Sequence, residues 1–234
     1  MIRDKRKSKE YFDEYIDRKL EDFMEFSEML NDGSVPTDRM HLLRQVLFDK
    51  KINMIIAMYS RGDALNEIEL EFNKVVEIWR ELVCEEKLDV IYTQNLWVIS
   101  MAVLFGWDDE KLAMIKDRLV EESINDWLFN FLLSDKESNP ELIEGELHEP
   151  EKYQTLKEAI CTSNKQLLIQ YLEKEWYGHF KDCGWYDSHK LTRKSQSIYF
   201  GYWCFEVAAV MKKLNWGDSE LLEQCYYPYD FAHF

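Results

Sequence analysis

Proline is scarce in this chain, and its placement limits the fold more than any other feature. The four prolines occupy positions 36, 140, 150 and 228, so residues 37–139 lack the residue that disrupts helices most strongly. Within that stretch, apolar residues recur every three to four positions, which is the spacing of one face of an α-helix. The sequence therefore predicts an all-α protein, a single multi-helix bundle of roughly eight to ten helices.

Capping residues divide the chain into predicted helices. Ser8 caps a first helix that ends at residues 31–33. Asp63 and Ser163 are expected to cap later helices, and Asn139-Pro140 to begin a short turn of helix. In chain order the other helices are expected at about 38–59, 65–83, 88–105, 108–131, 150–161 and 163–177.

The C-terminal region contains the most apolar predicted helix. Residues Tyr199–Leu214 place apolar side chains on most of a helical circumference, so this helix is expected at the centre of the bundle. Gly217 is expected to end it in the left-handed conformation, and Asp218 or Ser219 to cap a short helix that follows. The aromatic tail at 226–234 either folds back on the bundle, which we favour, or forms a binding patch.

The best candidate for a domain boundary is an acidic linker at residues 135–150. It would separate an N-terminal helical half, residues 1–134, from a C-terminal helical half, residues 151–234. Residues 96–109 follow the same plan as residues 202–218, namely an aromatic-led buried helix, a tryptophan beside a glycine and an acidic cap. This likeness predicts two pseudo-repeated halves, although chance similarity between helical sequences explains it equally well.

The negative charge is concentrated in one part of the chain. The net charge is −16, from 29 basic and 45 acidic residues. Between Asp108 and Glu151 there are four basic and 14 acidic residues, a local balance of 4 − 14 = −10. Such a surface repels the phosphates of nucleic acids and of anionic membranes, so neither is expected as a partner. It favours contact with a basic protein surface.

The acidic side chains of this stretch are the predicted contact with a basic partner. They are Asp108, Asp109, Glu110, Asp117, Glu121, Glu122, Asp126, Glu141, Glu144 and Glu146. This assignment is a hypothesis from charge density. A run of charges is also typical of a helix face that is simply solvated.

The residues that could carry chemistry do not form a recognisable catalytic or metal motif. His179, Cys183 and His189, with Asp187 nearby, are ligand types for zinc, but their spacing matches no closed four-ligand site. They could also suggest a Cys-His nucleophile, yet no glycine-rich oxyanion turn accompanies them. We expect a packed, hydrogen-bonded loop here, with no metal and no cofactor.

Glu206 falls on the apolar C-terminal helix, where a charged carboxylate is costly unless it has a partner. The favoured interpretation is a salt bridge or hydrogen bond with Arg193, Lys212 or a tyrosine. A catalytic acid or base and a contact with a buried ligand remain alternatives.

Cysteine usage and hydropathy indicate a reduced, soluble, cytoplasmic protein. The five cysteines are odd in number and share no CxxC spacing, which argues against a disulfide framework. The basic N-terminus is followed by acidic residues rather than by an apolar segment, so no export signal is expected. The longest apolar run, residues 96–107, is too short to span a membrane.

Several motifs of the sequence belong together. Those in the C-terminal half are Tyr202-Trp203-Cys204-Phe205-Glu206-Val207-Ala208-Ala209-Val210, Tyr226-Tyr227-Pro228-Tyr229-Asp230 and Asp182-Cys183-Gly184-Trp185-Tyr186-Asp187-Ser188-His189. Looser matches in the N-terminal half are Tyr11-Phe12-Asp13-Glu14-Tyr15-Ile16 and Tyr59-Ser60-Arg61-Gly62-Asp63. These motifs resemble those of the PoNe immunity proteins (PoNi), the cognate partners of polymorphic toxin DNases. One departure is Gly217-Asp218-Ser219, where the family pattern suggests two adjacent acids.

The resemblance implies a non-enzymatic immunity protein that binds a toxin nuclease and keeps it from acting in the cytosol. Charge steering toward the basic surface of the nuclease is the expected mechanism. Three alternatives stay open: immunity to a toxin that is not a nuclease, a helical scaffold without a toxin partner, and, least favoured, a hydrolase or metal enzyme. The sequence does not fix the oligomeric state, and a homodimer is one option.

Overall fold

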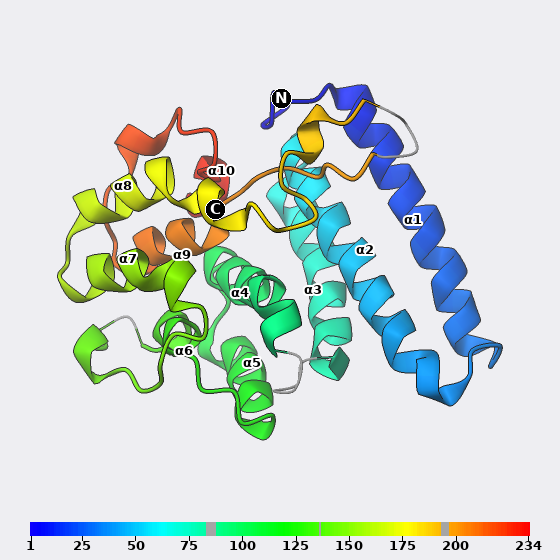
Figure 1. The fold of residues 1–234 in the computed structure, drawn as a ribbon, viewed down its shortest axis with the longest axis horizontal. Helices are drawn as coiled ribbons and strands as arrows, with labels where there is room; N and C mark the ends of the chain where they lie inside the picture. The colour runs from blue at the N-terminus through cyan, green and yellow to red at the C-terminus, as the bar shows by residue number, and fades with distance from the viewer. Residues whose placement is uncertain (83–87, 136, 193–196) are drawn as a thin grey trace. The chain divides into compact units, whose positions relative to one another are not determined.

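The computed structural model describes residues 1–82, 88–135, 137–192 and 197–234. Within these ranges the regular elements are α-helices and short 3-10 helices, with no sheet (Figure 1). The α-helices are labelled α1 to α10 in chain order. The predicted all-α fold is therefore confirmed.

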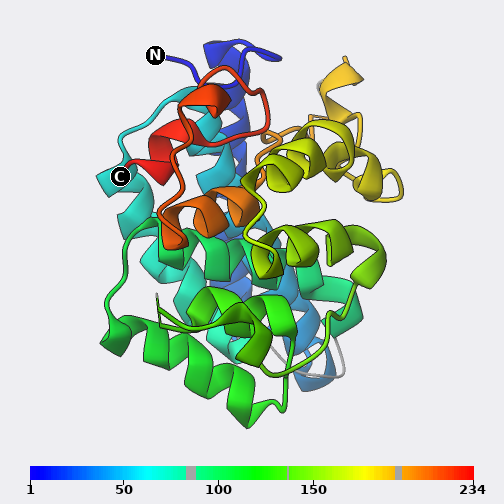
Figure 2. The same ribbon diagram turned by 90° about the vertical axis from the view of Figure 1, so that its left-hand side faces the viewer.

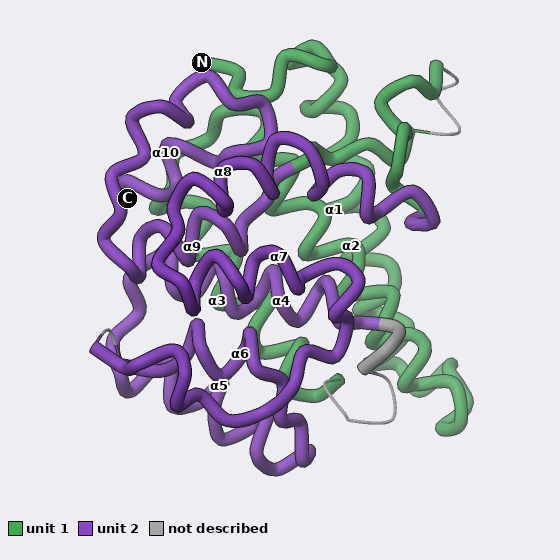
Figure 3. Tube along the Cα trace, turned by 60° about the vertical axis from the view of Figure 1, so that its left-hand side comes forward, with its two compact units in different colours: residues 1–82, 184–202 green, residues 83–183, 203–234 purple. Residues whose placement is uncertain are grey.

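The chain divides into two compact units, and each contains segments that are distant in the sequence (Figure 3). Unit 1 comprises Met1–Leu82 and Gly184–Tyr202, and unit 2 comprises Val83–Cys183 and Trp203–Phe234. The expected division at an acidic linker, residues 135–150, stays a prediction. The segment 184–202 belongs with the N-terminal helices although it lies late in the chain.

Unit 1 is built on three long helices, α1 (Lys9–Asn31), α2 (Met40–Arg61) and α3 (Leu65–Leu82). Helix α2 packs against both α1 and α3 (Figure 1). Ser8 caps α1 as predicted, with its hydroxyl accepting from the backbone N–H of Tyr11. Gly62 ends α2 in the left-handed conformation. Asp63 pairs with Arg61.

Unit 2 contains the remaining α-helices of the described chain. They are α4 (Leu88–Leu104), α5 (Asp109–Glu121), α6 (Trp127–Leu133), α7 (Pro150–Cys161), α8 (Lys165–Lys174), α9 (Phe205–Lys213) and α10 (Tyr229–Ala232). Helix α9 packs against α4, α6 and α10, and α7 packs against α8 (Figure 2). All but one residue of α9 is buried, so it is a central helix as predicted, although a shorter one.

The aromatic tail folds back within unit 2, in agreement with the favoured interpretation. Phe231 is buried, with its ring 4.6 Å from that of Phe105 and 5.9 Å from that of Phe205 between centroids. The Tyr227 hydroxyl donates to the Asp218 carboxylate at 2.7 Å. Asp218 therefore holds the tail in place and does not cap the short helix Ser219–Leu221.

The prediction of a helix from Tyr199 was wrong, because residues 199–204 are not helical and α9 begins only at Phe205. Gly201 has a φ of 120°, and the polar backbone groups on either side of it bond to distant residues. The Ser60 hydroxyl donates to the carbonyl of Phe200 at 2.8 Å, and the Tyr199 N–H donates to the Tyr11 hydroxyl at 3.1 Å. These tertiary hydrogen bonds replace the intrahelical ones that the apolar pattern predicts.

Four helices of unit 2 end with the same backbone motif. A residue with positive φ follows the helix, and the next N–H donates to the carbonyl five residues back, which is the Schellman arrangement. The left-handed residues are Gly106, Ser123, Ser163 and Asn215. The hydrogen bonds run from the backbone N–H groups of Trp107, Ile124, Asn164 and Trp216 to the carbonyls of Ala102, Leu119, Ala159 and Met211, respectively, at 2.8–3.2 Å.

This motif corrects three local predictions. Asn215, not Gly217, is the left-handed residue after α9. Ser163 ends α7, and Asn164 caps α8 by accepting from the N–H of Leu167. The acidic helix expected to continue from 108 to 131 is two helices, because Ser123 interrupts it.

The described helices include none that combines the length and the apolar character needed to cross a bilayer.

Candidate functional site

The acidic stretch of the sequence begins at the N-terminus of α5. The Asp108 carboxylate accepts from the N–H of Lys111 at 3.0 Å and so caps the helix, and Asp109 and Glu110 follow in its first turn. Acidic side chains are stabilised there because unpaired N–H groups give the helix N-terminus a partial positive charge. Glu110 and Asp117 are seven residues apart and lie on the same exposed side of α5.

The opposite side of α5 is apolar and fixes the helix on unit 2. Ile115 and Leu119 have exposures of 0% and 3%. They are four residues apart, so they form one buried stripe. The local sequence thus turns the carboxylates of α5 toward solvent.

Asp126 is an acid with a structural role. It is 2% exposed and caps α6, accepting from the N–H of Phe129 at 2.9 Å. Its other oxygen accepts from the Tyr92 hydroxyl at 3.1 Å and from the N–H of His148 at 2.8 Å. Burial raises the pKa of Asp126, although these hydrogen bonds oppose the rise. Its inclusion in the predicted contact is corrected here, because its carboxylate is not accessible.

The segment after α6 folds back onto the turn that precedes this helix. The N–H of Trp127 donates to the carbonyl of Glu146 at 3.0 Å, and the side chain of Asn130 donates to the carbonyl of Glu144 at 3.1 Å. Gly145 has a φ of 95°, and a Cβ added there would lie 2.7 Å from the carbonyl oxygen of Asn125. Only glycine allows this close approach.

As a consequence, the returning segment lies beside the turn that follows α5. It carries the exposed residues Glu141, Glu144 and Glu146; Glu146 is bridged to Asp126 in that turn, whereas Glu141 lies on a 3-10 helix that packs against α7. A 3-10 helix at Pro140–Leu142, capped by Asn139 as predicted, positions the first of them.

The ten predicted contact residues differ in whether their carboxylates are exposed and whether they form ion pairs with other described residues. Asp126 is buried, and Arg118 pairs with both Glu121 at 3.1 Å and Glu122 at 2.5 Å. The other seven are exposed and form no ion pair with any described residue. We call these seven the acidic surface: Asp108, Asp109, Glu110, Asp117, Glu141, Glu144 and Glu146.

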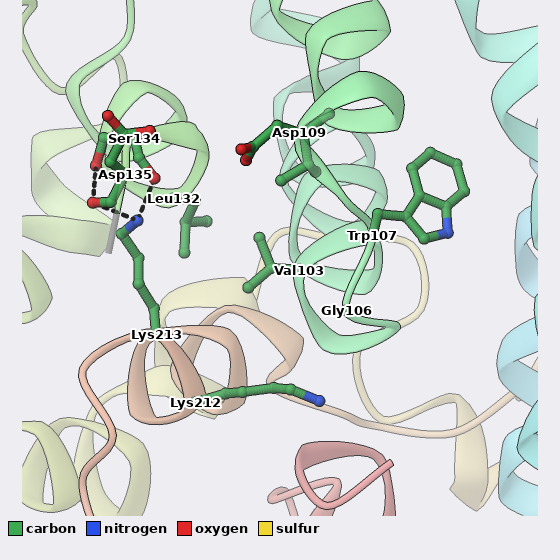
Figure 4. Close-up of a pocket in the computed structure, with 10 residues that line it drawn as sticks. Val103, Gly106, Trp107, Asp109, Leu132, Ser134, Asp135, Lys212 and Lys213 are labelled. Carbon is green, nitrogen blue, oxygen red and sulfur yellow. Dashed lines mark hydrogen bonds between the residues drawn. The ribbon is translucent and has the colours of Figure 1, made fainter. Parts of the chain in front are cut away.

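A pocket of about 440 Å³ adjoins the acidic surface within unit 2 (Figure 4). Residues of α4, α5, α6 and α9 and of the segments that follow α4 and α6 line it, so no local sequence pattern could have indicated it. Its lining residues are Val103, Gly106, Trp107, Asp109, Leu112, Leu132, Ser134, Asp135, Lys212 and Lys213. Asp109 belongs both to this pocket and to the acidic surface.

Glu206 lies in the interior of unit 2 at 1% exposure. The indole N–H of Trp176 donates to its Oε1 at 2.6 Å, a partner that the sequence did not indicate. Its Oε2 and the hydroxyls of Tyr153 and Tyr171 have no hydrogen-bond partner among the described residues. Burial without a cation raises the pKa of Glu206 to about 7.

Of the other partners considered for Glu206, Lys212 bonds elsewhere. The Lys212 ammonium donates to the carbonyls of Leu104 and Phe234, at 2.7 and 3.0 Å. Arg193 is outside the described residues. The predicted hydrogen-bonded state is therefore confirmed with a different partner.

The histidines and cysteine of the suspected metal cluster make separate hydrogen bonds or pack into the surface. Nδ1 of His179 lies 3.0 Å from the carbonyl of Lys152, and Nδ1 of His189 lies 3.0 Å from the Tyr202 hydroxyl. Cys183 is half-buried, which raises the pKa of its thiol. In the described part of the chain, no group of three or more His, Cys, Asp or Glu side chains could hold a metal ion.

Comparison with known families covers almost the whole chain. The family described as PoNe immunity protein (PoNi), N-terminal, matches residues 3–116. The family described as PoNe immunity proteins (PoNi), C-terminal, matches residues 124–231. No curated protein and no solved structure matches the chain.

The two matches follow one another in chain order and leave out only short segments. Together they include α5 up to residue 116 and the whole segment from Ser134 to Pro150, whereas Asp117 lies in the gap between the two matches. On these matches, the chain belongs to the PoNe immunity protein (PoNi) family.

Proposed function

We propose that this chain neutralises a DNA-cleaving PoNe toxin by covering the basic, DNA-binding surface of the toxin with the acidic surface of unit 2. Family membership implies an immunity protein that acts against a PoNe toxin. The proposal adds the target of the toxin, the surface that binds it and the physical basis of inhibition. Binding alone is sufficient, and no reaction by this chain is needed.

The observation that carries the proposal is the set of exposed carboxylates without ion pairs among the described residues. If lysine or arginine side chains of the chain itself neutralised these carboxylates, the carboxylates would produce little electrostatic field in the solvent. The seven carboxylates of the acidic surface instead lie in a stretch with a charge balance of 4 − 14 = −10. Long-range attraction from such a surface raises the association rate with a positively charged partner.

Occlusion follows from the chemistry of a nuclease. An enzyme that cuts DNA binds a polyanion and needs lysine and arginine side chains around its groove. An acidic protein docked on that groove competes for the same side chains. A specific interface of about 1,600 Å² would be large enough to exclude a duplex.

The proposed site of action is the cytosol, where a toxin DNase would meet chromosomal DNA. The free cysteines among the described residues, Cys161, Cys183, Cys204 and Cys225, form no disulfides and are compatible with a reducing compartment.

Competition between this chain and DNA tests the proposal. A catalytically inactive form of the toxin is bound to a fluorescent DNA duplex, and the chain is then titrated in. We expect full release of the duplex at molar equivalence, and loss of plasmid cleavage when the active toxin is treated in the same way. A stable ternary complex of toxin, chain and duplex would contradict occlusion, and a toxin that leaves DNA intact would favour a target other than DNA.

A further inference from the structure

We propose that the pocket in unit 2 receives one aromatic side chain of the toxin that carries a hydrogen-bond donor, a tyrosine or a tryptophan. This inference rests on the proposed function, because it assigns a specific anchor within the same interface. It concerns the apolar part of the contact, which charge steering does not address.

The apolar part of the pocket wall can pack against an aromatic ring. Val103 of α4, Leu112 of α5 and Leu132 of α6 contribute apolar side chains from three helices. Figure 4 shows Val103 and Leu132 between the Asp109 side of the pocket and the Lys213 side. The volume of about 440 Å³ accommodates one aromatic side chain, and a buried ring contributes more apolar area than other side chains.

The charges around the pocket cancel, unlike those of the surface beside it. Two aspartates, Asp109 and Asp135, and two lysines, Lys212 and Lys213, line it, a balance of 2 − 2 = 0. An arginine or lysine of the toxin would meet two ammonium groups, and an acidic side chain would meet two carboxylates. A neutral side chain avoids both penalties.

The ammonium groups of Lys212 and Lys213 already donate hydrogen bonds to backbone carbonyls, whereas the Asp109 carboxylate can accept one from a ligand. Lys213 donates to the carbonyl of Ser134 at 2.5 Å and to that of Asp135 at 3.3 Å (Figure 4). Lys212 is held by two backbone carbonyls. The Asp109 carboxylate is exposed, forms no ion pair with a described residue and points toward the Ser134 side of the pocket (Figure 4). A phenol O–H or an indole N–H can donate to it.

The first test uses small molecules and needs no toxin. p-Cresol represents a tyrosine side chain, and n-propylguanidinium represents arginine. In methyl NMR spectra of the full chain, p-cresol should shift the resonances of Val103, Leu112 and Leu132 in a saturable manner, and n-propylguanidinium should not. Larger shifts with n-propylguanidinium, or unshifted methyls with p-cresol, would overturn the proposal.

The second test fills the pocket. Leu112→Trp should raise the dissociation constant for the toxin at least tenfold. The matched control is Leu222→Trp, at a position that is 57% exposed in the same unit and outside the pocket, and it should bind like the wild type. Wild-type affinity of a folded Leu112→Trp protein would refute the anchor.

The outcomes separate this inference from the proposed function. If the wild type does not bind the toxin, the proposed function fails, and the p-cresol measurement still decides the chemistry of the pocket. If the wild type binds and Leu112→Trp binds equally well, only the anchor fails. Circular dichroism of each variant establishes that it is folded, and the p-cresol test on the wild type does not depend on any variant.

Discussion

At the scale of the residue, Glu206 shows how burial changes the state of an ionisable group. Its carboxylate accepts a hydrogen bond from Trp176, and no cation within the described structure stabilises its charge. The groups that face it are the hydroxyls of Tyr153 and Tyr171 and the Cys204 thiol, whose own pKa values burial raises well above the ordinary range. Between pH 5 and neutrality, Glu206 is therefore the group in this cluster that titrates.

The pH dependence of stability follows from this shift. Because the pKa of Glu206 is about 7 in the folded chain and 4.5 ordinarily, the folded state binds more protons between these values. The free energy of unfolding should fall as pH rises through this window, by about 3 kcal/mol from this group. Glu206→Gln should remove that part of the slope in urea unfolding at about pH 5 to about pH 8. Parallel pH profiles for the two proteins would contradict the assignment.

Asp126 provides a second test at this scale. Asp126→Ala leaves the N–H groups of Phe129 and His148 and the Tyr92 hydroxyl without their acceptor. The free energy of unfolding should fall by about 2–4 kcal/mol. Asp117→Ala, at an exposed position on α5, should change it by less than about 0.5 kcal/mol. Equal effects of the two substitutions in denaturant unfolding would argue against a buried capping role for Asp126.

At the scale of the element, sequence reasoning succeeded where a helix end depends on local chemistry. Ser8, Asp108 and Asn139 accept hydrogen bonds from N–H groups two or three residues away, so the sequence contains all that is needed to predict them. The same reasoning could not predict the conformation before Phe205. Partners from Ser60 and Tyr11 hold that segment, and neither is near it in the sequence.

The sequence also contains little that indicates which residue adopts the left-handed conformation at each helix end. Serine at 123 and 163 and asparagine at 215 occupy a conformation that favours glycine, at some cost in strain. The pocket was missed because α4, α5, α6 and α9 each contribute only part of its lining.

A substitution at such a helix end should therefore be stabilising. Ser163→Gly relieves the strain at a φ of 51° and should raise the free energy of unfolding by up to about 1 kcal/mol. The control, Ser219→Gly, lies in the 3-10 helix Ser219–Leu221 and should lower it by about 0.5–1 kcal/mol, because glycine gains freedom in the unfolded chain. Thermal melts of both variants check the sign, and destabilisation by Ser163→Gly would be the contrary result.

At the scale of the whole molecule, charge placement and family membership point in the same direction. The chain belongs to a family of immunity proteins against PoNe toxins, and seven carboxylates without ion pairs in the described structure are grouped in unit 2. Seven of the ten acids singled out in the sequence are exposed and form no ion pair with a described residue, and acids on a polar helix face are visible as composition. The sequence could not show that Asp126 turns inward, because that depends on the backbone path after α5. The pairs of Arg118 with Glu121 and Glu122 have the spacings i,i+3 and i,i+4, so helical periodicity alone could have indicated them.

The association rate with the toxin, measured by stopped flow as a function of salt, tests the central claim most directly. Two variants carry the same change in net charge: Asp109, Glu110, Asp117 and Glu144 replaced by lysine on the acidic surface, or Glu21, Glu25, Glu28 and Asp38 replaced by lysine at exposed positions of unit 1. The first should associate about tenfold or more slowly than the wild type at low ionic strength and lose most of the salt dependence. The second should retain most of the wild-type rate and slope. Equal effects of the two variants, or a wild-type rate that salt does not change, would contradict the account.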